Sequence, residues 1–350
     1  SCGKKAAAQI ALLMAGAAML CFGVWRGEAA TVLSKAIKYV WSVWVLGKKF
    51  SGVSQTMSRF RGWIQAGATL LTNLHLPNFL KGGLYQGAGK TVCVPGLNCY
   101  SCPAASGACP IGAFQAVVGS SKFSFSYYIT GFLILLGVLL GRFICGFLCP
   151  FGWFQELLHK IPTKKLSTKK LRPLTYLKYA VLLVMVFLLP AFLVNDVGMG
   201  DPFFCKYLCP QGVLEGAIPL SLANSGIRAA LGKLFTWKFS ILLSVIVLSV
   251  LFYRPFCKWL CPLGAFYALF NRVSLFQMKV DKSKCVSCGK CARACKMDVD
   301  VTKTPNHTEC IRCGMCIRAC PTNAVCFRYG FGDGKEKENA ATLRENNNKA

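Results

Sequence analysis

The sequence predicts a polytopic α-helical membrane protein with five or six transmembrane helices, followed by a small cysteine-rich domain. Hydrophobic residues make up 54% of the 350 residues and charged residues only 15%, a balance too apolar for an ordinary soluble protein of this length. The chain also has 21 cysteines, and so many thiols indicate zinc, iron–sulfur clusters or a disulfide scaffold. The size and hydrophobicity of the chain argue against a disulfide scaffold.

Five stretches lack charged residues over nearly the thickness of a bilayer, which about 20 helical residues cross. They are residues 6–25, 62–80, 123–141, 179–195 and 239–253. A sixth candidate, residues 31–46, contains Lys35 and Lys38 and either spans the membrane or lies at its surface. We therefore expect N-terminal helices and an outer cysteine segment over 1–122, a membrane domain over 123–278, a compact domain over 279–328 and a disordered tail over 329–350.

The basic residues predict the orientation. Lysine and arginine number 41 against 13 acidic residues, but they lie beside apolar runs, which indicates contact with membrane lipid and no nucleic-acid partner. Six of them fall in the loop after the third stretch: Lys160, Lys164, Lys165, Lys169, Lys170 and Arg172. This loop should be cytoplasmic, and counting spans from it places the C-terminal domain on the same side of a bacterial or archaeal cytoplasmic membrane.

The pattern CxxCxxCxxxC occurs twice between residues 285 and 320. In bacterial two-cluster ferredoxins, three closely spaced cysteines hold one 4Fe–4S cluster and the fourth reaches across to the other. The spacing therefore predicts a two-cluster ferredoxin domain, with a zinc module as the alternative. The first ligand set is Cys285, Cys288, Cys291 and Cys320; the second is Cys310, Cys313, Cys316 and Cys295. Cys326 lies outside the motif and is interpreted as an inert thiol.

A second pattern, CxxxCPxG, recurs in the apolar part of the chain at residues 145–152, 205–212 and 257–264, with a variant over 99–112. Each full copy supplies two thiolates one helical turn apart, so two copies must combine to fill a four-iron cluster. The predicted topology brings one set together at the cytoplasmic face: Cys145, Cys149, Cys257 and Cys261. An outer-face cluster would draw its ligands from Cys99, Cys102, Cys109, Cys205 and Cys209.

Other interpretations of these cysteines stay open. The outer-face thiols, Cys93 among them, could form disulfides in an oxidising compartment. The four inner thiols could bind zinc or be inert. Cys2 and Cys21 have no partner pattern and are interpreted as incidental. The sequence thus predicts two 4Fe–4S clusters in the C-terminal domain and up to two more in the membrane domain.

The stretches RFICGFLCPFGWFQELLHKIP and RPFCKWLCPLGAF, followed by the doubled ferredoxin motif, resemble membrane-bound polyferredoxin-type proteins over about residues 127–325. The chain is similar to the membrane iron–sulfur (quinol dehydrogenase) subunit of periplasmic nitrate reductase systems. It is also similar to the C-terminal half of the nitrous-oxide-reductase accessory membrane protein. The resemblance implies electron transfer between a cytoplasmic or quinol pool and a partner redox protein.

We therefore expect an electron-transfer component of an oxidoreductase system. It would relay electrons between cytoplasmic ferredoxin-type clusters and membrane or extracytoplasmic redox partners. Two alternatives are a quinol dehydrogenase module that uses a bound quinone, and an assembly or reactivation factor for a partner metalloenzyme. No phosphate-binding glycine loop, catalytic triad or nucleotide fingerprint is evident. Glu156 and Glu215, which follow two motif prolines at similar offsets, are interpreted first as acids at helix N-termini.

Overall fold

The computed structural model describes residues 50–120, 127–196 and 198–330. The expected spans 6–25 and 31–46, together with Cys2, Cys21 and most of the predicted tail, lie outside the described residues.

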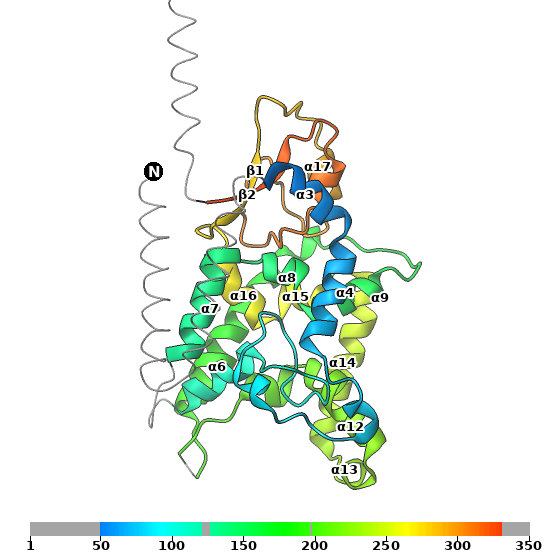
Figure 1. Cartoon of the computed structure of the whole chain (residues 1–350), viewed down its shortest axis with the longest axis vertical. Coiled ribbons are helices and arrows are strands. Elements are labelled where there is room, and N and C mark those ends of the chain that lie inside the picture. Colours follow the sequence, from blue (N-terminus) through cyan, green and yellow to red (C-terminus); the bar gives the residue numbers. More distant parts are fainter. Residues whose placement is uncertain (1–49, 121–126, 197, 331–350) are drawn as a thin grey trace, which may run out of the picture.

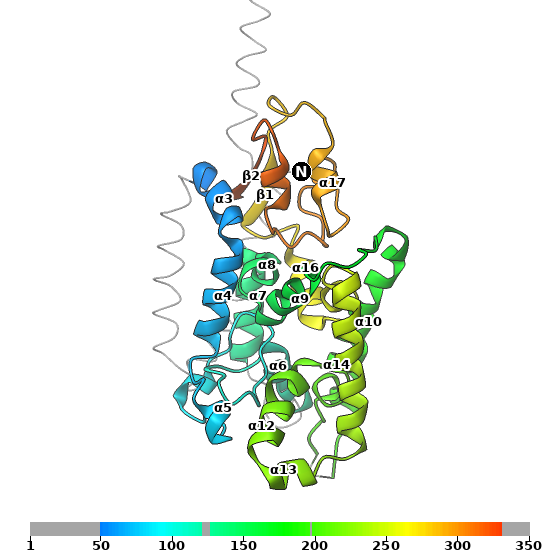
Figure 2. The ribbon, with the colours of Figure 1, turned by 90° about the vertical axis from the view of Figure 1, so that its right-hand side faces the viewer.

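The described chain is arranged in zones along its longest axis, with the C-terminal domain at one end and α12 and α13 at the other (Figures 1 and 2). The C-terminal domain contains β1 (Phe276–Val280), α17 (Lys290–Ala294), α18 (Met315–Ala319) and β2 (Val325–Tyr329), with α3 (Phe50–Arg59) beside it. Next to it lie α7 (Tyr127–Leu140), α8 (Phe143–Phe147), α9 (Pro150–His159), α15 (Pro255–Trp259) and α16 (Pro262–Phe270). Towards the other end lie α5 (Asn78–Lys81), α6 (Pro110–Gly119), α12 (Ile218–Ala223) and α13 (Ser225–Ala229).

Longer helical segments connect these zones. Helices α4 (Arg61–Thr72) and α14 (Lys233–Leu251) run along the middle of the molecule (Figure 2). The remaining elements are η2 (Ala88–Thr91), η3 (Lys169–Tyr176), α10 (Leu177–Val181), η4 (Leu182–Leu188), α11 (Leu189–Phe192), η5 (Phe204–Leu208) and η6 (Gly212–Ala217).

Two helical segments of the described chain are long and apolar enough to cross a membrane. They are Lys169–Phe192, of 24 residues, and Lys233–Leu251, of 19 residues. They contain most of the predicted spans 179–195 and 239–253. Both expose large apolar side chains: Leu183 is 57% exposed and Leu243 is 53% exposed. Such exposed apolar surface is typical of a face that contacts lipid or another protein.

The expected number of five or six membrane helices is not confirmed. The predicted span 62–80 is interrupted, because α4 ends at Thr72 and α5 begins only at Asn78. Pro77 explains part of this break, since the residue before a proline is disfavoured in helical conformation. The predicted span 123–141 contains α7, which has 14 residues and is shorter than the roughly 20 that cross a bilayer.

The C-terminal domain is closed by the antiparallel pair of β1 and β2, in which Phe276 pairs with Tyr329 and Val280 with Val325. The sheet therefore begins three residues before the predicted segment 279–328 and joins its two ends. Inside it the two halves are alike, because Gly289 and Gly314 precede α17 and α18 with φ of 68° and 76°. Only glycine adopts this left-handed conformation without strain.

An aromatic core joins this domain to α8. Phe143 and Phe147 of α8 stack on each other, and Phe143 lies 4.6 Å from Phe276 between ring centroids. Phe327 of β2 contacts the same group, and all four side chains are buried. Such packing is expected to fix the domain on α8, because buried aromatic side chains contribute large apolar areas.

Charged side chains reinforce the same interface. Arg142, which precedes α8, and Lys178 of α10 both form ion pairs with Glu309 of the C-terminal domain. Arg142 and Lys178 have 0% exposure. A buried charge is tolerated when it is paired, whereas loss of one partner is costly. The network therefore specifies how the C-terminal domain sits on the helices.

Candidate cysteine-ligated cofactor sites

The structure brings the ferredoxin-motif cysteines together in the two crossed sets that their spacing predicts. One small cavity is lined by Cys285, Cys288, Cys291 and Cys320. A second is lined by Cys295, Cys310, Cys313 and Cys316. The crossing arises because the fourth cysteine of each motif follows a short helix, α17 or α18, that turns the chain towards the other half. We call these the tip set and the base set.

A third group, which we call the proximal set, lies beside the C-terminal domain. It comprises Cys145 of α8, Cys149 before α9, Cys257 of α15 and Cys261 before α16. All four are buried and lie within electrostatic range of one another. Cys149 and Cys261 occupy the cap position just before the motif prolines. The structure thus combines the two CxxxCP copies that the predicted topology pairs at the cytoplasmic face.

A fourth group, the distal set, lines a cavity of about 900 Å³ farther from the C-terminal domain. It comprises Cys99, Cys109, Cys205 and Cys209, with Cys93 also in the wall. Cys102 is not among the lining residues. It is 1% exposed, lies with Ala104 and Ala105, and donates its thiol to Asn73 Oδ1 at 3.6 Å. Of the five outer cysteines expected from the sequence, four therefore line one cavity and Cys102 does not.

The distal and proximal sets are built in the same way. Gln155 of α9 donates its side-chain N–H to Cys257 Sγ at 3.1 Å and accepts the Phe256 N–H at 3.2 Å. Gln115 of α6 donates to Cys205 Sγ at 3.2 Å and accepts the Phe204 N–H at 3.0 Å. Each glutamine lies five residues after its motif proline and is 0% exposed. We call this arrangement the glutamine clamp.

The sequence interpretation missed the glutamine clamps. The sequence does contain a sign of them: both glutamines lie at the same distance from their motif proline, which is visible when the motif copies are aligned on that proline. In the other two copies the same position holds Glu215, which accepts the Cys99 N–H at 3.0 Å, and Tyr267, whose hydroxyl donates to the Pro95 carbonyl at 3.1 Å. All four copies thus use this position to hold backbone or sulfur atoms of another segment. The prediction that Glu215 serves mainly as an acid at a helix N-terminus misses this contact.

The donor chemistry of the four sets fits 4Fe–4S clusters. Each set supplies four thiols, and backbone N–H groups point at sulfur, as with Gly264 on Cys261 at 3.3 Å and Ala324 on Cys320 at 3.3 Å. Hydrogen bonds to cysteine sulfur are among the features that tune such clusters. Within the described residues no three metal-ligating side chains lie close enough to hold a single metal ion. All nineteen described cysteines are free, so the disulfide alternative gains no support.

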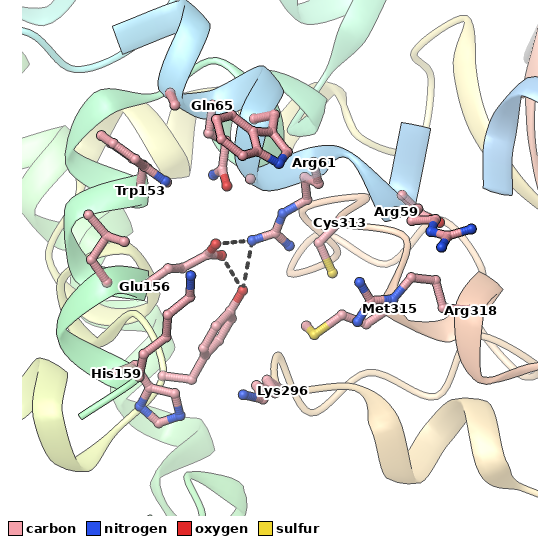
Figure 3. Close-up of a pocket in the computed structure, with 17 residues that line it drawn as sticks. Arg59, Arg61, Gln65, Trp153, Glu156, His159, Lys296, Cys313, Met315 and Arg318 are labelled. Atoms are coloured by element: carbon pink, nitrogen blue, oxygen red, sulfur yellow. Dashed lines mark hydrogen bonds and ion pairs between the residues drawn. The ribbon is translucent and has the colours of Figure 1, made fainter. Parts of the chain in front are cut away.

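A polar cavity of about 620 Å³ lies between α4, α9 and the C-terminal domain (Figure 3). Cys313 of the base set forms part of its wall. Glu156 accepts hydrogen bonds from Arg61 and Tyr253 inside it. Burial alone would raise the pKa of Glu156, but the guanidinium groups of Arg254 and Arg61 lower this pKa below its ordinary value. Glu156 is therefore a carboxylate at neutral pH. The sequence interpretation treats it as an acid at a helix N-terminus, but in the structure it also belongs to a buried ion-pair network.

Comparison with known proteins agrees with this arrangement. Residues 107–127, 124–169, 178–218 and 235–283 each match the model of a 4Fe–4S binding domain. Residues 277–321 match a 4Fe–4S dicluster domain. The first match contains only the last part of the variant motif, with Cys109 and Pro110, whereas the next three each contain one full CxxxCP copy. The fifth contains the doubled ferredoxin motif. The fold and its sites therefore define an iron–sulfur protein of the ferredoxin type.

The chain belongs to the polyferredoxin-type 4Fe–4S proteins, which confirms the resemblance seen in the sequence. It is 32% identical over 209 residues to uncharacterized protein MJ0750 of Methanocaldococcus jannaschii, covering 57% of this chain and 77% of that protein. It is 28% identical over 168 residues to regulatory protein NosR of Stutzerimonas stutzeri, covering 46% of this chain and 21% of that protein. It is 26% identical over 150 residues to ferredoxin-type protein NapH of Haemophilus influenzae, covering 31% of this chain and 52% of that protein.

The chain thus spans about half of NapH and about a fifth of NosR. No solved structure gives a significant match to the chain.

We expect Gln155→Leu to lower the reduction potential of a cluster held by the proximal set, because an N–H···S hydrogen bond stabilises the more negative, reduced state. A loss of about 1 kcal/mol corresponds to roughly 40 mV for one electron. Redox titration followed by electron paramagnetic resonance would measure it. Gln115→Leu is the matched control, because it should shift only the distal signal. An equal shift of the proximal signal in both variants, or no shift of that signal in Gln155→Leu, would contradict the assignment.

Proposed function

We propose that this chain is a membrane-bound electron relay that holds four 4Fe–4S clusters in its tip, base, proximal and distal sets. Bound clusters of this kind supply one-electron redox chemistry. The observation that carries the proposal is the contact between two cysteine-bearing segments. A Cβ atom on Gly146 would lie 2.3 Å from the Ile311 carbonyl oxygen. Gly146 adjoins Cys145 of the proximal set, and Ile311 lies between Cys310 and Cys313 of the base set.

Buried polar contacts support this close approach. Arg312, which is 1% exposed, donates to the Leu140 and Asn271 carbonyl oxygens at 2.7 Å each. Asn271 in turn donates to the Cys310 carbonyl at 2.9 Å. The loop between Cys310 and Cys313 is therefore fixed to the ends of α7 and α16. Such a rigid contact suits electron transfer, because it keeps two redox centres close without any domain movement.

The distal set lies farther along α14. Lys238, near the start of that helix, donates to the Cys205 carbonyl at 2.9 Å. The helix ends at Leu251, six residues before Cys257 of the proximal set. The thirteen residues between Lys238 and Leu251 rise by about 20 Å. This rise of the helix is shorter than the hydrocarbon thickness of about 30 Å, which supports distal and proximal sets that lie at different depths of one membrane.

The position of the basic loop supports a cytoplasmic C-terminal domain. Arg172 donates to the Asp298 carbonyl at 2.9 Å, and Thr168 hydrogen-bonds the Asp298 carboxylate. The lysine-rich loop and the ferredoxin-type domain therefore lie on the same side of the apolar helices. Because basic loops stay in the cytoplasm, we place this domain in the cytoplasm and the distal set near the outer face of a bacterial or archaeal cytoplasmic membrane.

The contact at Gly146 provides a direct test. We expect Gly146→Ala to push the 310–313 loop away from α8 at a cost of about 1–3 kcal/mol. It should also weaken the magnetic interaction between the reduced base and proximal centres, measured as broadening in electron paramagnetic resonance spectra. Gly67→Ala is the control, because a Cβ atom there meets no other atom within 4 Å. The relay proposal would lose its main support if both variants behaved like the native chain.

The polar cavity favours a second candidate function, oxidation of a quinol. Trp63 at its edge is 79% exposed, on the α4 face that also exposes Leu70 and Leu71. An apolar carrier could therefore enter from the lipid. Gln65 in the wall is 1% exposed and neither polar atom of its amide has a hydrogen-bond partner. Because unpaired buried polar groups are costly, a ligand oxygen at this position would stabilise the site.

For this second function we expect Gln65→Leu to slow reduction of the protein by decylubiquinol about tenfold, the equivalent of one lost hydrogen bond. Absorbance changes after rapid mixing would measure the rate. Gln55→Leu is the control, because Gln55 binds Asn323 outside the cavity. Reduction by dithionite should be the same in all variants. If decylubiquinol reduced neither the native chain nor the variants, the quinol function would be rejected while the relay proposal stayed intact.

A further inference from the structure

The loop between β1 and α17 has two side chains that are unusually exposed for their type, one cysteine and one valine. Among the nineteen cysteines of the described residues, Cys288 alone is exposed. Val286, two residues before it, is 65% exposed and is the one large hydrophobic side chain exposed within residues 276–330. The loop lies at the end of the molecule opposite α12 and α13 in both views (Figures 1 and 2). The tip set therefore has an edge that a soluble protein can reach.

Basic side chains surround this edge. Residues 281–293 contain four basic residues and one acidic residue, a net charge of +3. The basic residues Lys282, Lys284, Lys290 and Arg293 are all exposed. Arg293 reaches over the motif and donates to the Cys288 carbonyl at 3.0 Å. The one acid, Asp281, is already engaged by Ser283 and lies 3.9 Å from Lys284. We call this surface, residues 282–293, the cationic tip.

We propose that the cationic tip docks an acidic, soluble protein that carries one electron at a time. The inference rests on the proposed relay function and identifies its cytoplasmic partner. An apolar centre with a charged rim is the usual anatomy of a protein interface. Charge complementarity selects the partner, because positive surfaces speed the encounter with negative ones and repel a second copy of the same surface. The tip also points away from the apolar helices, which argues against a lipid headgroup as its occupant.

The proposed reaction transfers one electron from the carrier to this chain. The reduced carrier loses one electron and the oxidised chain gains it at the tip set, beside Cys288. No bond is made or broken and no proton moves. The role of the basic residues is to orient the carrier, and they do not take part in the redox change. Their effect should therefore depend on ionic strength, because salt screens exposed charges.

The test uses the full chain in detergent and a reduced acidic plant-type ferredoxin as the probe, mixed anaerobically at low salt. The combined variant Lys282→Glu, Lys284→Glu and Lys290→Glu should lower the second-order rate constant about tenfold or more and flatten its salt dependence. The matched control is Lys81→Glu, Arg228→Glu and Lys233→Glu, which makes the same charge change with exposed residues at the other end of the molecule. It should leave the rate within about twofold.

Reduction by chemically reduced methyl viologen, a small cation, distinguishes failure of the docking inference from failure of the relay proposal. If methyl viologen reduces the native chain and both variants but the ferredoxin rate does not respond to the tip charges, the docking inference is overturned and the relay stands. Equal losses in the tip variant and the control would also overturn it, because net charge alone would then explain the effect. If methyl viologen cannot reduce the native chain, the relay function fails and the docking inference fails with it.

Discussion

The position of the C-terminal domain on the helices depends on one backbone contact, that of the Ile311 carbonyl against Gly146. No side chain larger than hydrogen fits at this position, because a Cβ atom would lie 2.3 Å from the carbonyl oxygen. The buried guanidinium of Arg312 and the aromatic group of Phe143, Phe147, Phe276 and Phe327 hold the two segments together. The ferredoxin-type domain is thereby fixed beside the proximal cysteines, a rigid arrangement that the proposed relay requires.

The proximal and distal sites are two versions of one design. In each, a motif helix contributes a glutamine whose N–H binds the sulfur of another motif copy and whose oxygen accepts the preceding backbone N–H. This double contact fixes the relative register of the two copies, which contribute cysteines from distant parts of the chain. The same geometry also places a donor on one sulfur of each site. One buried side chain thus combines structural support with a hydrogen bond to sulfur, as is common around metal ligands.

The sequence predicts the cysteine sets well because ligand spacing is a strong geometric constraint. The spacing of two CxxCxxCxxxC motifs strongly favours the crossed ligand arrangement. A CxxxCP copy supplies only two thiols, so two copies must combine to reach four. The structure brings these cysteines together, and their role as cluster ligands stays a prediction. Cys102 was harder to place, because its CxxC spacing to Cys99 is ligand-like while a local turn directs its thiol to Asn73. Hydropathy likewise could not distinguish a spanning helix from short helices such as α4, and the polar cavity depends on tertiary contacts between segments such as α4 and α9.

The most direct test of the account is the amount of iron and acid-labile sulfide bound per polypeptide after anaerobic purification in detergent. The account predicts about 16 of each, four for every one of the tip, base, proximal and distal sets. About 8 of each would mean that only the ferredoxin-type domain holds clusters. That result would contradict the central claim, because the proximal and distal cysteines would then have no redox centre to carry electrons into the membrane.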